Sequence, residues 1–246
     1  MAESPFPTSS SAEDSDWISI SDLMSGLMLV FLCIAVLFMQ QFMQQQVELA
    51  DSYQRVKREL VAELHEEFDD DLERWDAEII DATLTVRFRN PEALFADGDF
   101  ALKKQFRDIL QQFFPRLVSI VYEPSFREYI LEVRVEGHTS SFWTARASKE
   151  EAYIKNMWLS QMRAFSVLEY ALGLKGLGAS PEWLQARLRG NGLSSSHLIT
   201  LPNGDEDPER SRRVEFRIVT DAEAQMLELK RRIEKMADGQ RPQEAR

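Results

Sequence analysis

Cysteine is almost absent from this chain of 246 residues, and so is any motif built on histidine. The single cysteine, Cys33, excludes an intrachain disulfide. The three histidines, His65, His138 and His197, are far apart in the sequence, and we interpret each as a surface or structural residue rather than a metal ligand. No nucleophile elbow, phosphate loop, HExxH or cysteine-pair motif occurs. The sequence therefore predicts neither an enzyme nor a bound cofactor.

Positive charge is also scarce. The chain has 29 Lys and Arg residues against 41 Asp and Glu residues, which gives a formal net charge of −12. Because nucleic-acid binding depends on basic side chains that neutralise phosphates, we predict no nucleic-acid partner. No Lys or Arg precedes position 22, where a cleaved signal peptide would carry its positive segment. The apolar helix that follows is therefore expected to stay in the mature protein.

What the sequence has instead is one long apolar run near its N-terminus. No charged residue occurs from position 23 to position 39, and only Ser25 and Gly26 interrupt the run. About 20 residues at ~1.5 Å rise per residue cross the ~30 Å hydrocarbon core of a bilayer. We predict a single transmembrane helix over residues 17–43. Residues 1–16, rich in Ser, Pro and acidic side chains, are expected to form a disordered tail.

Asp22 stands at the start of this helix, and its role has two interpretations. In the first, Ser19, Ser21 or Asp22 is the N-cap, whose side chain accepts hydrogen bonds from the first backbone N–H groups. In the second, Asp22 lies within the bilayer, where desolvation favours its neutral form and makes it a reversible proton carrier. The physics of the residues alone leaves both open. A helical stripe with small or polar residues at its N-terminal end, which suits contact with other helices, comprises Asp22, Ser25, Gly26, Leu29, Cys33, Val36 and Gln40.

Residues 44–78 are predicted to form an amphipathic connector helix. Such a helix can pack against a second copy of the chain or against the domain that follows, and the sequence leaves both open. The segment is too short to be assigned as a coiled coil. The apolar side chains recur every three to four residues and are Tyr53, Val56, Leu60, Leu64, Phe68, Leu72 and Trp75.

Residues 79–220 have the pattern of an α+β or α/β domain, because segments of alternating polarity are interspersed with segments of helical periodicity. Pro115 is a possible break in the first helix. Residues 221–246 are expected to form an amphipathic helix, up to residue 237, and a polar tail. The expected elements of the domain are a strand over 82–90, a helix over 102–121, a strand over 129–136, a helix over 156–172, a short helix or strand over 183–189, a polar loop over 191–208 and a strand over 214–219.

Four segments of this domain carry a likeness to a known family. They are LFADGDFALK (94–103), VEGHTSS (135–141), NMWLSQMRAFSVLEYAL (156–172) and RSRRVEFRI (210–218). In this order they resemble the OmpA-like peptidoglycan-binding family, over about residues 84–219. The resemblance implies a βαβαβ domain in the α+β class that binds the stem peptide of the cell wall. In that family an Asp and an Arg hold the carboxylate and the amine of diaminopimelate.

The family's Arg corresponds to Arg163, whose guanidinium suits a bidentate contact with a carboxylate. The family's Asp does not carry over, because Ser140 occupies its place, and Glu150 or Glu151 is considered as a substitute acid. A retained fold with altered or lost ligand binding is the alternative, in which the arginines at 212 and 213 form structural ion pairs. The peptidoglycan-binding residues that the resemblance implies are Thr139, Ser140, Asn156, Arg163 and Arg213.

A membrane helix with the pattern W-x-x-x-x-D-L-M, joined to such a domain, resembles the B subunit of flagellar-type ion-driven stators. Within that class, the segment SISDLMSGLMLVFL and the short connector most resemble the B subunits of Zorya antiphage-defence motors. The resemblance implies that Asp22 carries the ion, a proton rather than sodium, and that Ser21, Ser25 and Gly26 line its path. It also implies two copies of the chain, a homodimer, inside a pentameric ring of a multi-helix A subunit (an A5B2 complex).

The same resemblance implies a location in the bacterial inner membrane, in contact with lipid, with a cytoplasmic N-terminus and a periplasmic C-terminal domain. The basic residues that follow the helix, Arg55, Lys57 and Arg58, favour the opposite orientation under the positive-inside rule. A domain that binds peptidoglycan is useful only outside, so we expect the first orientation. The expected function is a proton-driven motor subunit anchored to the wall. The alternatives are a passive peptidoglycan tether, in which Asp22 only caps the helix, and a flagellar-type stator subunit without a role in defence.

Overall fold

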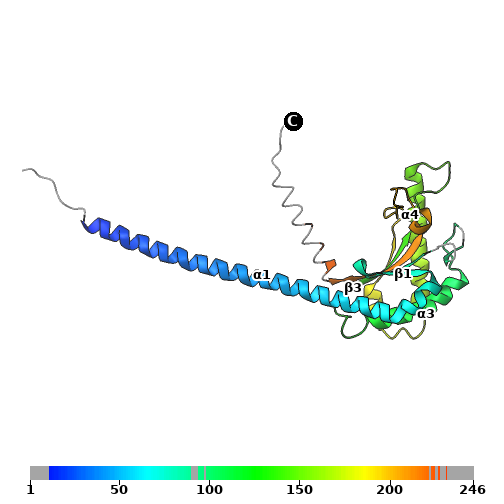
Figure 1. The fold of residues 1–246 in the computed structure, drawn as a ribbon, viewed down its shortest axis with the longest axis horizontal. Helices are drawn as coiled ribbons and strands as arrows, with labels where there is room; N and C mark the ends of the chain where they lie inside the picture. Colours follow the sequence, from blue (N-terminus) through cyan, green and yellow to red (C-terminus); the bar gives the residue numbers. More distant parts are fainter. Residues whose placement is uncertain are drawn as a thin grey trace, which may run out of the picture. The chain divides into compact units, whose positions relative to one another are not determined.

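The computed structural model describes the backbone of residues 11–89, 94–96, 98–221, 223–224, 227 and 231. It describes side chains from residue 23 to 44 and, within those ranges, from residue 54 onward. The chain divides into two compact units, Met1–Ser52 and Tyr53–Arg246 (Figure 1). We describe each unit by itself.

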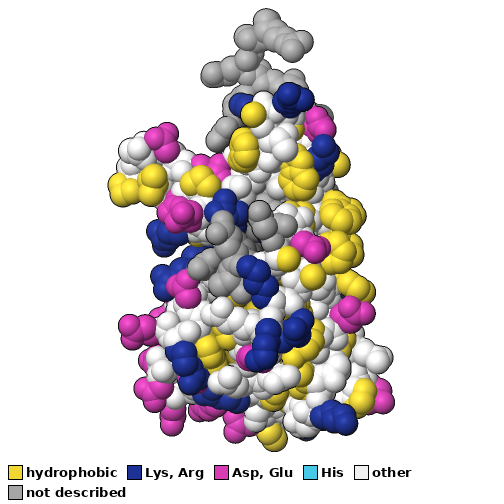
Figure 2. Space-filling view, turned by 90° about the vertical axis from the view of Figure 1, so that its right-hand side faces the viewer, with side chains coloured by type: hydrophobic (Ala, Val, Ile, Leu, Met, Phe, Trp, Pro, Cys, Tyr) yellow, Lys and Arg dark blue, Asp and Glu magenta, His cyan; other side chains and the backbone are white. Residues whose placement is uncertain are grey.

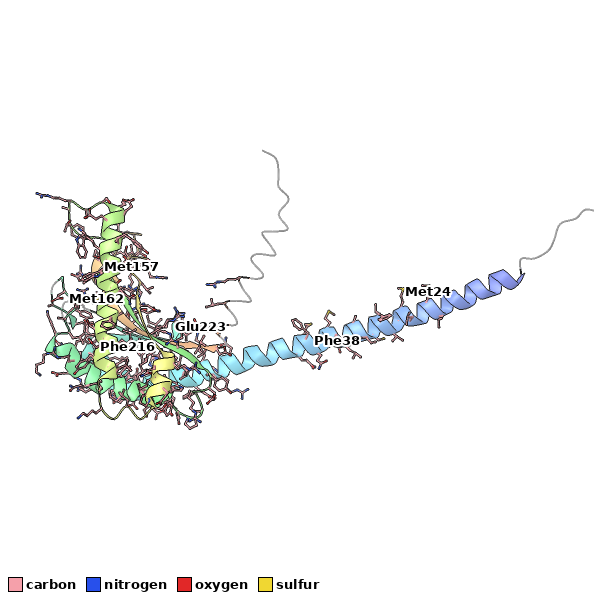
Figure 3. The ribbon with its side chains drawn as sticks, turned by 180° about the vertical axis from the view of Figure 1, so that it is seen from behind. Met24, Phe38, Met157, Met162, Phe216 and Glu223 are labelled. Carbon is pink, nitrogen blue, oxygen red and sulfur yellow. The ribbon has the colours of Figure 1, made fainter. Side chains whose placement is uncertain are left out.

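The first unit consists of the N-terminal part of helix α1 (Ser11–Trp75). Its segment Leu23–Gln44 has a mean hydropathy of 2.4, is not buried, and is long and apolar enough to cross a membrane. Met24 and Phe38 project from this segment (Figure 3). Residues 11–16, expected in the disordered tail, are helical. Residues 1–10 lie outside the described residues.

The second unit begins within the segment that was expected to be a separate connector. Val56, Leu60, Leu64 and Phe68 are buried in the core of this unit. The apolar stripe of the connector therefore packs into its own domain and not against a second copy of the chain. The side chain of Tyr53 lies outside the described residues. The helix ends at Trp75, because Asp76 adopts a left-handed conformation with φ of 49°.

The sheet of this unit is mixed, with strand order β1-β2-β5-β3-β4. Only β3 and β4 pair in parallel, as expected across a helical crossover. The α+β class is confirmed, and the three expected strands correspond to β2, β3 and β5, whereas β1 and β4 were not predicted. The strands are β1 (Ala77–Ile80), β2 (Thr85–Phe88), β3 (Ile130–His138), β4 (Leu188–Gly192) and β5 (Arg213–Thr220).

The strand expected over residues 82–90 is shorter in the structure. Residues Asp81–Thr83 form a single 3-10 turn, η1, and Leu84 then takes a left-handed conformation with φ of 49°. The extended backbone begins only at Thr85. Because β1 precedes this turn and pairs with β2, the two strands form a hairpin at the edge of the sheet that alternation alone did not indicate.

Four further helices have bounds within the part of this unit that the structure describes. The expected break at Pro115 is absent from α3, which buries five side chains before that proline and four after it. Helix α4 begins before the predicted residue 156, because Ser148 caps it and accepts a hydrogen bond from Glu151 N at 3.1 Å. The helices are α3 (Lys104–Val121), α4 (Lys149–Leu172), α5 (Pro181–Arg187) and α6 (Pro208–Ser211). Of the helix expected over 221–237, the described residues 221, 223, 224, 227 and 231 are helical.

Helix α4 lies directly on the strands that it connects, and two glycines allow this. A Cβ atom at Gly137 on β3 would lie 2.4 Å from Ser160 O, and one at Gly192 on β4 would lie 2.3 Å from Gln161 N. Gln161 also binds the backbone of β4, since its Oε1 accepts a hydrogen bond from Gly192 N at 2.7 Å. This close contact fixes the height of α4 above the sheet and so positions the side chains that α4 presents at the sheet's edge.

Candidate functional site

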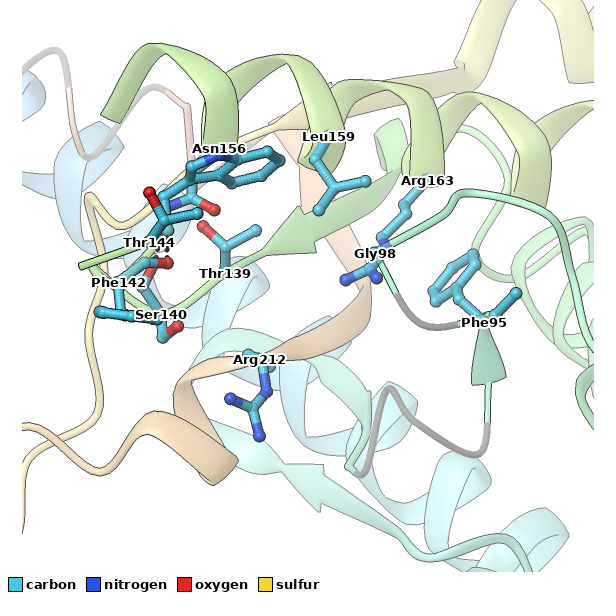
Figure 4. A pocket seen from close by; sticks show the side chains of 12 residues that line it. Phe95, Gly98, Thr139, Ser140, Phe142, Thr144, Asn156, Leu159, Arg163 and Arg212 are labelled. Carbon is cyan, nitrogen blue, oxygen red and sulfur yellow. Dashed lines mark hydrogen bonds between the residues drawn. The ribbon is translucent and has the colours of Figure 1, made fainter. Parts of the chain in front are cut away.

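A pocket of about 340 Å³ lies where β3 ends, beside α4 (Figure 4). Figure 4 shows Thr139 and Ser140 on one side and Arg163 with Phe95 on the other. Four of the five residues expected to bind peptidoglycan are thus brought together from two elements. The lining residues are Phe95, Ala96, Gly98, Thr139, Ser140, Phe142, Trp143, Thr144, Asn156, Leu159, Arg163 and Arg212.

Arg163 is held in place on two sides. Its Nε donates a hydrogen bond to Asp99 O at 2.9 Å, and its guanidinium carbon lies 4.9 Å from the centre of the Phe95 ring. The side chain is buried, although its residue lines the pocket. A guanidinium fixed in this way pays little entropy on contact with a ligand carboxylate, which favours a charge-assisted bidentate pair.

Asn156 acts on the shape of the pocket. Its Nδ2 donates hydrogen bonds to Ser140 O at 3.0 Å and to Phe142 O at 3.2 Å, so it holds the loop that follows β3. Thr139 is also anchored through its backbone, since its N–H donates to Ser194 O at 3.0 Å. The hydroxyl of Thr139 is buried and has no hydrogen-bond partner among the residues that the structure describes. A ligand group could satisfy that hydroxyl.

Arg213, the fifth expected residue, does not line this pocket. Its Nε donates to Glu215 Oε1 at 2.6 Å and its Nη1 to Ser211 O at 2.9 Å. Successive residues of a strand point to opposite faces, so the preceding Arg212 lines the pocket instead. Arg213 therefore forms the structural ion pair that the sequence left open as an alternative.

Neither candidate substitute for the missing acid lines the pocket. Glu150 belongs to the first turn of α4, and Glu151 pairs with Lys155 at 2.6 Å. No carboxylate occurs among the described lining residues, whereas two arginines do. The described lining residues thus offer two guanidinium groups, which suit contact with an anionic group.

One contact at the rim of the pocket was not predicted from the sequence. Glu206 accepts a hydrogen bond from Ser141 N at 2.9 Å and a second from the Ser141 hydroxyl. This carboxylate fixes the loop after β3 from outside the pocket. The two residues are 65 positions apart, so no local pattern could have joined them.

A buried charged cluster lies behind the pocket. Burial raises the pKa of Glu136 and lowers the pKa of His138. Burial also acts to raise the pKa of Glu215, but His138 and Arg213 together hold that pKa well below its usual range. Neither Glu136 nor Glu215 lines the pocket. Elsewhere, acidic and basic side chains are interspersed on the face shown in Figure 2.

The residues expected to form the ion path belong to α1 of the first unit. The backbone of Ser21 and Asp22 is helical, but their side chains lie outside the described residues. Ser25 and Gly26 are exposed, and a Cβ at Gly26 would meet nothing within 4 Å. Small residues on an exposed apolar helix allow a neighbouring helix to approach closely.

An apolar N-terminal helix that can span a membrane, followed by an α+β domain with a pocket lined by two arginines, defines a class of single-helix envelope proteins. No family model matches the chain. It is 40% identical over 220 residues to the Zorya protein ZorB of Escherichia coli (strain Crooks), covering 88% of this chain and 93% of that protein. A second Zorya protein ZorB, from Escherichia coli O139:H28, is 24% identical, covering 85% and 82%. The chain belongs to the ZorB family.

Two solved structures show a partial likeness to this chain. A putative MotB-like protein from Desulfovibrio vulgaris is 24% identical, with a TM-score of 0.45, covering 70% of this chain and 94% of that one. The periplasmic domain of Helicobacter pylori MotB is 18% identical, with a TM-score of 0.40, covering 68% and 92%.

Proposed function

We propose that this chain is the B subunit of an inner-membrane, proton-driven rotary motor of the stator type that acts in Zorya antiphage defence. Two copies would cross the membrane inside a pentameric ring of the multi-helix A subunit. The N-terminus would be cytoplasmic, and the domain that begins at Tyr53 would be periplasmic and bind peptidoglycan.

The observation that carries this proposal is the 40% identity to a Zorya protein ZorB over 88% of the chain. The unit from Tyr53 onward makes up less than 88% of the chain, so the match extends into the apolar segment that precedes it. The likeness thus involves both the membrane helix and the domain, and a motor subunit needs both parts. A passive tether needs only an anchor and a wall-binding domain.

In this proposal Asp22 alternately takes up and releases a proton at the interface with the ring. Ser21, Ser25 and Gly26 line the path, where small side chains admit the neighbouring helices. Neutralising Asp22 removes the cost of a charge in the bilayer and so changes which neighbours the helix prefers. Each proton would move the ring by one step relative to the anchored pair of B subunits.

The test of the motor is Asp22→Asn in the full chain with its A subunit and the other proteins of the system. Asn caps a helix about as well as Asp but cannot carry a proton. We therefore expect loss of phage protection, measured as efficiency of plating, with membrane levels of the subunit unchanged. Asp16→Asn, which removes an acid outside the apolar run, is the matched control and should protect normally. Full protection by Asp22→Asn would leave the tether as the better explanation.

The wall-binding part rests on the pocket beside α4. Arg163 would bind a stem-peptide carboxylate, with Thr139, Ser140 and Asn156 shaping the site around it. The expected result of Arg163→Ala is loss of co-sedimentation with purified sacculi. Arg146→Ala removes the same charge from an exposed position that does not line the pocket, and it should leave binding unchanged. Equal binding by both variants would exclude Arg163 from the site.

A further inference from the structure

Two carboxylates and one imidazole share one face of the sheet behind the pocket. Glu136 and His138 are two residues apart on β3, and Glu136 is the cross-strand partner of Glu215 on β5. All three residues are buried, with exposed fractions of 5%, 3% and 7%. Like charges directly opposite one another destabilise a sheet, and burial increases the cost. The arrangement therefore requires something that neutralises it.

The imidazole lies between the two acids without bonding to either. His138 Nε2 is 3.6 Å from Glu215 Oε2 and 3.8 Å from Glu136 Oε2, beyond the usual range of a hydrogen bond. Neither ring nitrogen of His138 has a hydrogen-bond partner among the described residues. A buried polar group left unsatisfied destabilises the folded state, so a ligand that occupied the gap would remove that cost.

The spacing of these atoms is close to that of a metal coordination shell. One ligand atom from each of the three side chains lies within 4.8 Å of the others. Zinc bonds of ~2.0–2.2 Å to nitrogen and carboxylate oxygen place neighbouring ligand atoms roughly 3.3 Å apart in tetrahedral geometry. The two distances from His138 Nε2, 3.6 and 3.8 Å, need to shrink by only a few tenths of an ångström to reach that value, and the two carboxylate oxygens lie within 4.8 Å of each other.

One carboxylate oxygen of Glu215, Oε1, accepts hydrogen bonds from two arginines. Arg213 Nε and Arg87 Nε donate to Glu215 Oε1 at 2.6 and 2.7 Å, which turns Oε2 toward His138. Arg87 also donates to Glu78 Oε1 at 3.0 Å, so it links Glu215 to a further carboxylate. Outer contacts of this kind orient a metal-binding carboxylate and tune the site.

We propose that Glu136, His138 and Glu215 bind one divalent transition-metal ion, zinc being the best match. A site with one imidazole and two carboxylates suits zinc better than calcium or magnesium, which prefer shells of oxygen alone. His197, whose ring centre lies 6.2 Å from that of His138, or a water completes the fourth position. The metal would join β3 to β5 at the point where the chain enters the pocket through Thr139.

The test uses the full chain in detergent, purified with a tag that contains no histidine and stripped with a chelator. Zinc is titrated by calorimetry, and cobalt is bound in its place so that its visible spectrum reports the coordination. We expect one equivalent of zinc per chain and a tetrahedral cobalt spectrum. Glu136→Gln and His138→Gln should each weaken zinc binding at least tenfold.

The matched control is His65→Gln, because His65 also contacts two carboxylates but lies on the exposed surface. It should bind zinc like the original chain. Circular dichroism of each metal-free variant checks that it folds. If His138→Gln does not fold, the Tm decides: zinc should raise the Tm of the original chain and not that of Glu136→Gln. Absence of saturable binding, or equal binding by all variants, overturns the proposal.

Discussion

The ring of Phe68 on α1 lies 5.0 Å from the ring of Phe113 on α3. Phe113 in turn contacts Phe88 on β2 and Phe216 on β5, each at 5.0 Å. The aromatic core therefore joins α1, α3 and the sheet, and Figure 3 labels Phe216 within the domain. The part of α1 after Tyr53 is a structural element of the domain and not a spacer in front of it.

Phe68→Ala tests this relationship. Phe68 is fully buried, and removal of a buried phenyl ring costs about 3–5 kcal/mol of unfolding free energy. We expect a loss of that size in urea unfolding followed by tryptophan fluorescence, since Trp75 lies 6.0 Å from Phe68. Glu66→Ala changes an exposed side chain on the same helix and should alter stability by less than about 0.5 kcal/mol. Equal effects of both variants would mean that α1 is not part of the core.

Gly192→Ala tests the contact between α4 and β4. The added Cβ would lie 2.3 Å from Gln161 N and 2.5 Å from Gln161 Cα, both of which belong to the rigid helix. We expect a loss of about 1–3 kcal/mol, as for other overpacked sites, measured as a lower denaturation midpoint.

Gly190→Ala is the matched control for that variant, since it lies on the same strand. Its Cβ would meet Leu168 Cδ2 at 3.5 Å, an ordinary contact. It should leave α4 in place and retain more of the stability than Gly192→Ala does. The reverse order of stability would contradict the close packing of α4 on β4.

Much of this fold could be predicted from periodicity, and what was missed has identifiable causes. The helix α3 and the strands β3 and β5 have strong apolar patterns. Strand β4, with the sequence LRGNG, has no alternating apolar residues, because its glycines serve the close approach of α4. Only tertiary contact makes that segment a strand.

The candidate site could also be predicted only in part. Some of its residues belong to recognisable segments, whereas others come together only in the folded chain. Thr139, Asn156 and Arg163 belong to segments that resemble a known family, and they come together in the pocket. The choice between Arg212 and Arg213 depends on which face of β5 each occupies, and sequence alone did not indicate it. Contacts such as Ser141 with Glu206 depend on folded loops and have no local signal.

The stability of the domain should depend on pH through His65, which joins α1 to the turn η1. Its Nε2 lies 2.9 Å from Asp81 Oδ1 and its Nδ1 lies 2.7 Å from Asp69 Oδ1. The hydrogen bond to Asp81, followed by that to Asp69, raises the pKa of His65 above 6.5. The stabilisation is therefore complete below pH 6.5 and is lost as the pH rises through the higher folded-state pKa.

The measurement compares the original chain with His65→Gln in urea at pH 5.5 and pH 8.5. Because His65 is partly exposed, the difference in stability at the lower pH should be below about 1 kcal/mol and should shrink at the higher pH. Asp81→Asn should remove most of the same pH dependence. A difference that grows with rising pH would have the wrong sign for this interaction.

The last prediction concerns an acid that the described lining of the pocket does not contain. Two arginines line the pocket, and Ser140 stands where the resembled family has an Asp. If the pocket binds a stem peptide through Arg163 alone, Ser140→Asp should supply a partner for the amine of diaminopimelate. A charge-assisted hydrogen bond contributes about 1.5–3 kcal/mol, so binding of a diaminopimelate-containing peptide should tighten roughly tenfold or more.

A peptide with the same carboxylates but with the side-chain amine acetylated is the control ligand for calorimetry. Acetylation removes the charge that the new Asp would bind, so the original chain should bind both peptides about equally and Ser140→Asp should prefer the free amine. Ala145→Asp adds the same charge further along the chain, at an exposed position outside the lining, and should give no such preference. If Ser140→Asp weakens both peptides equally, the added charge repels the ligand's carboxylate, and the amine lies elsewhere than beside position 140.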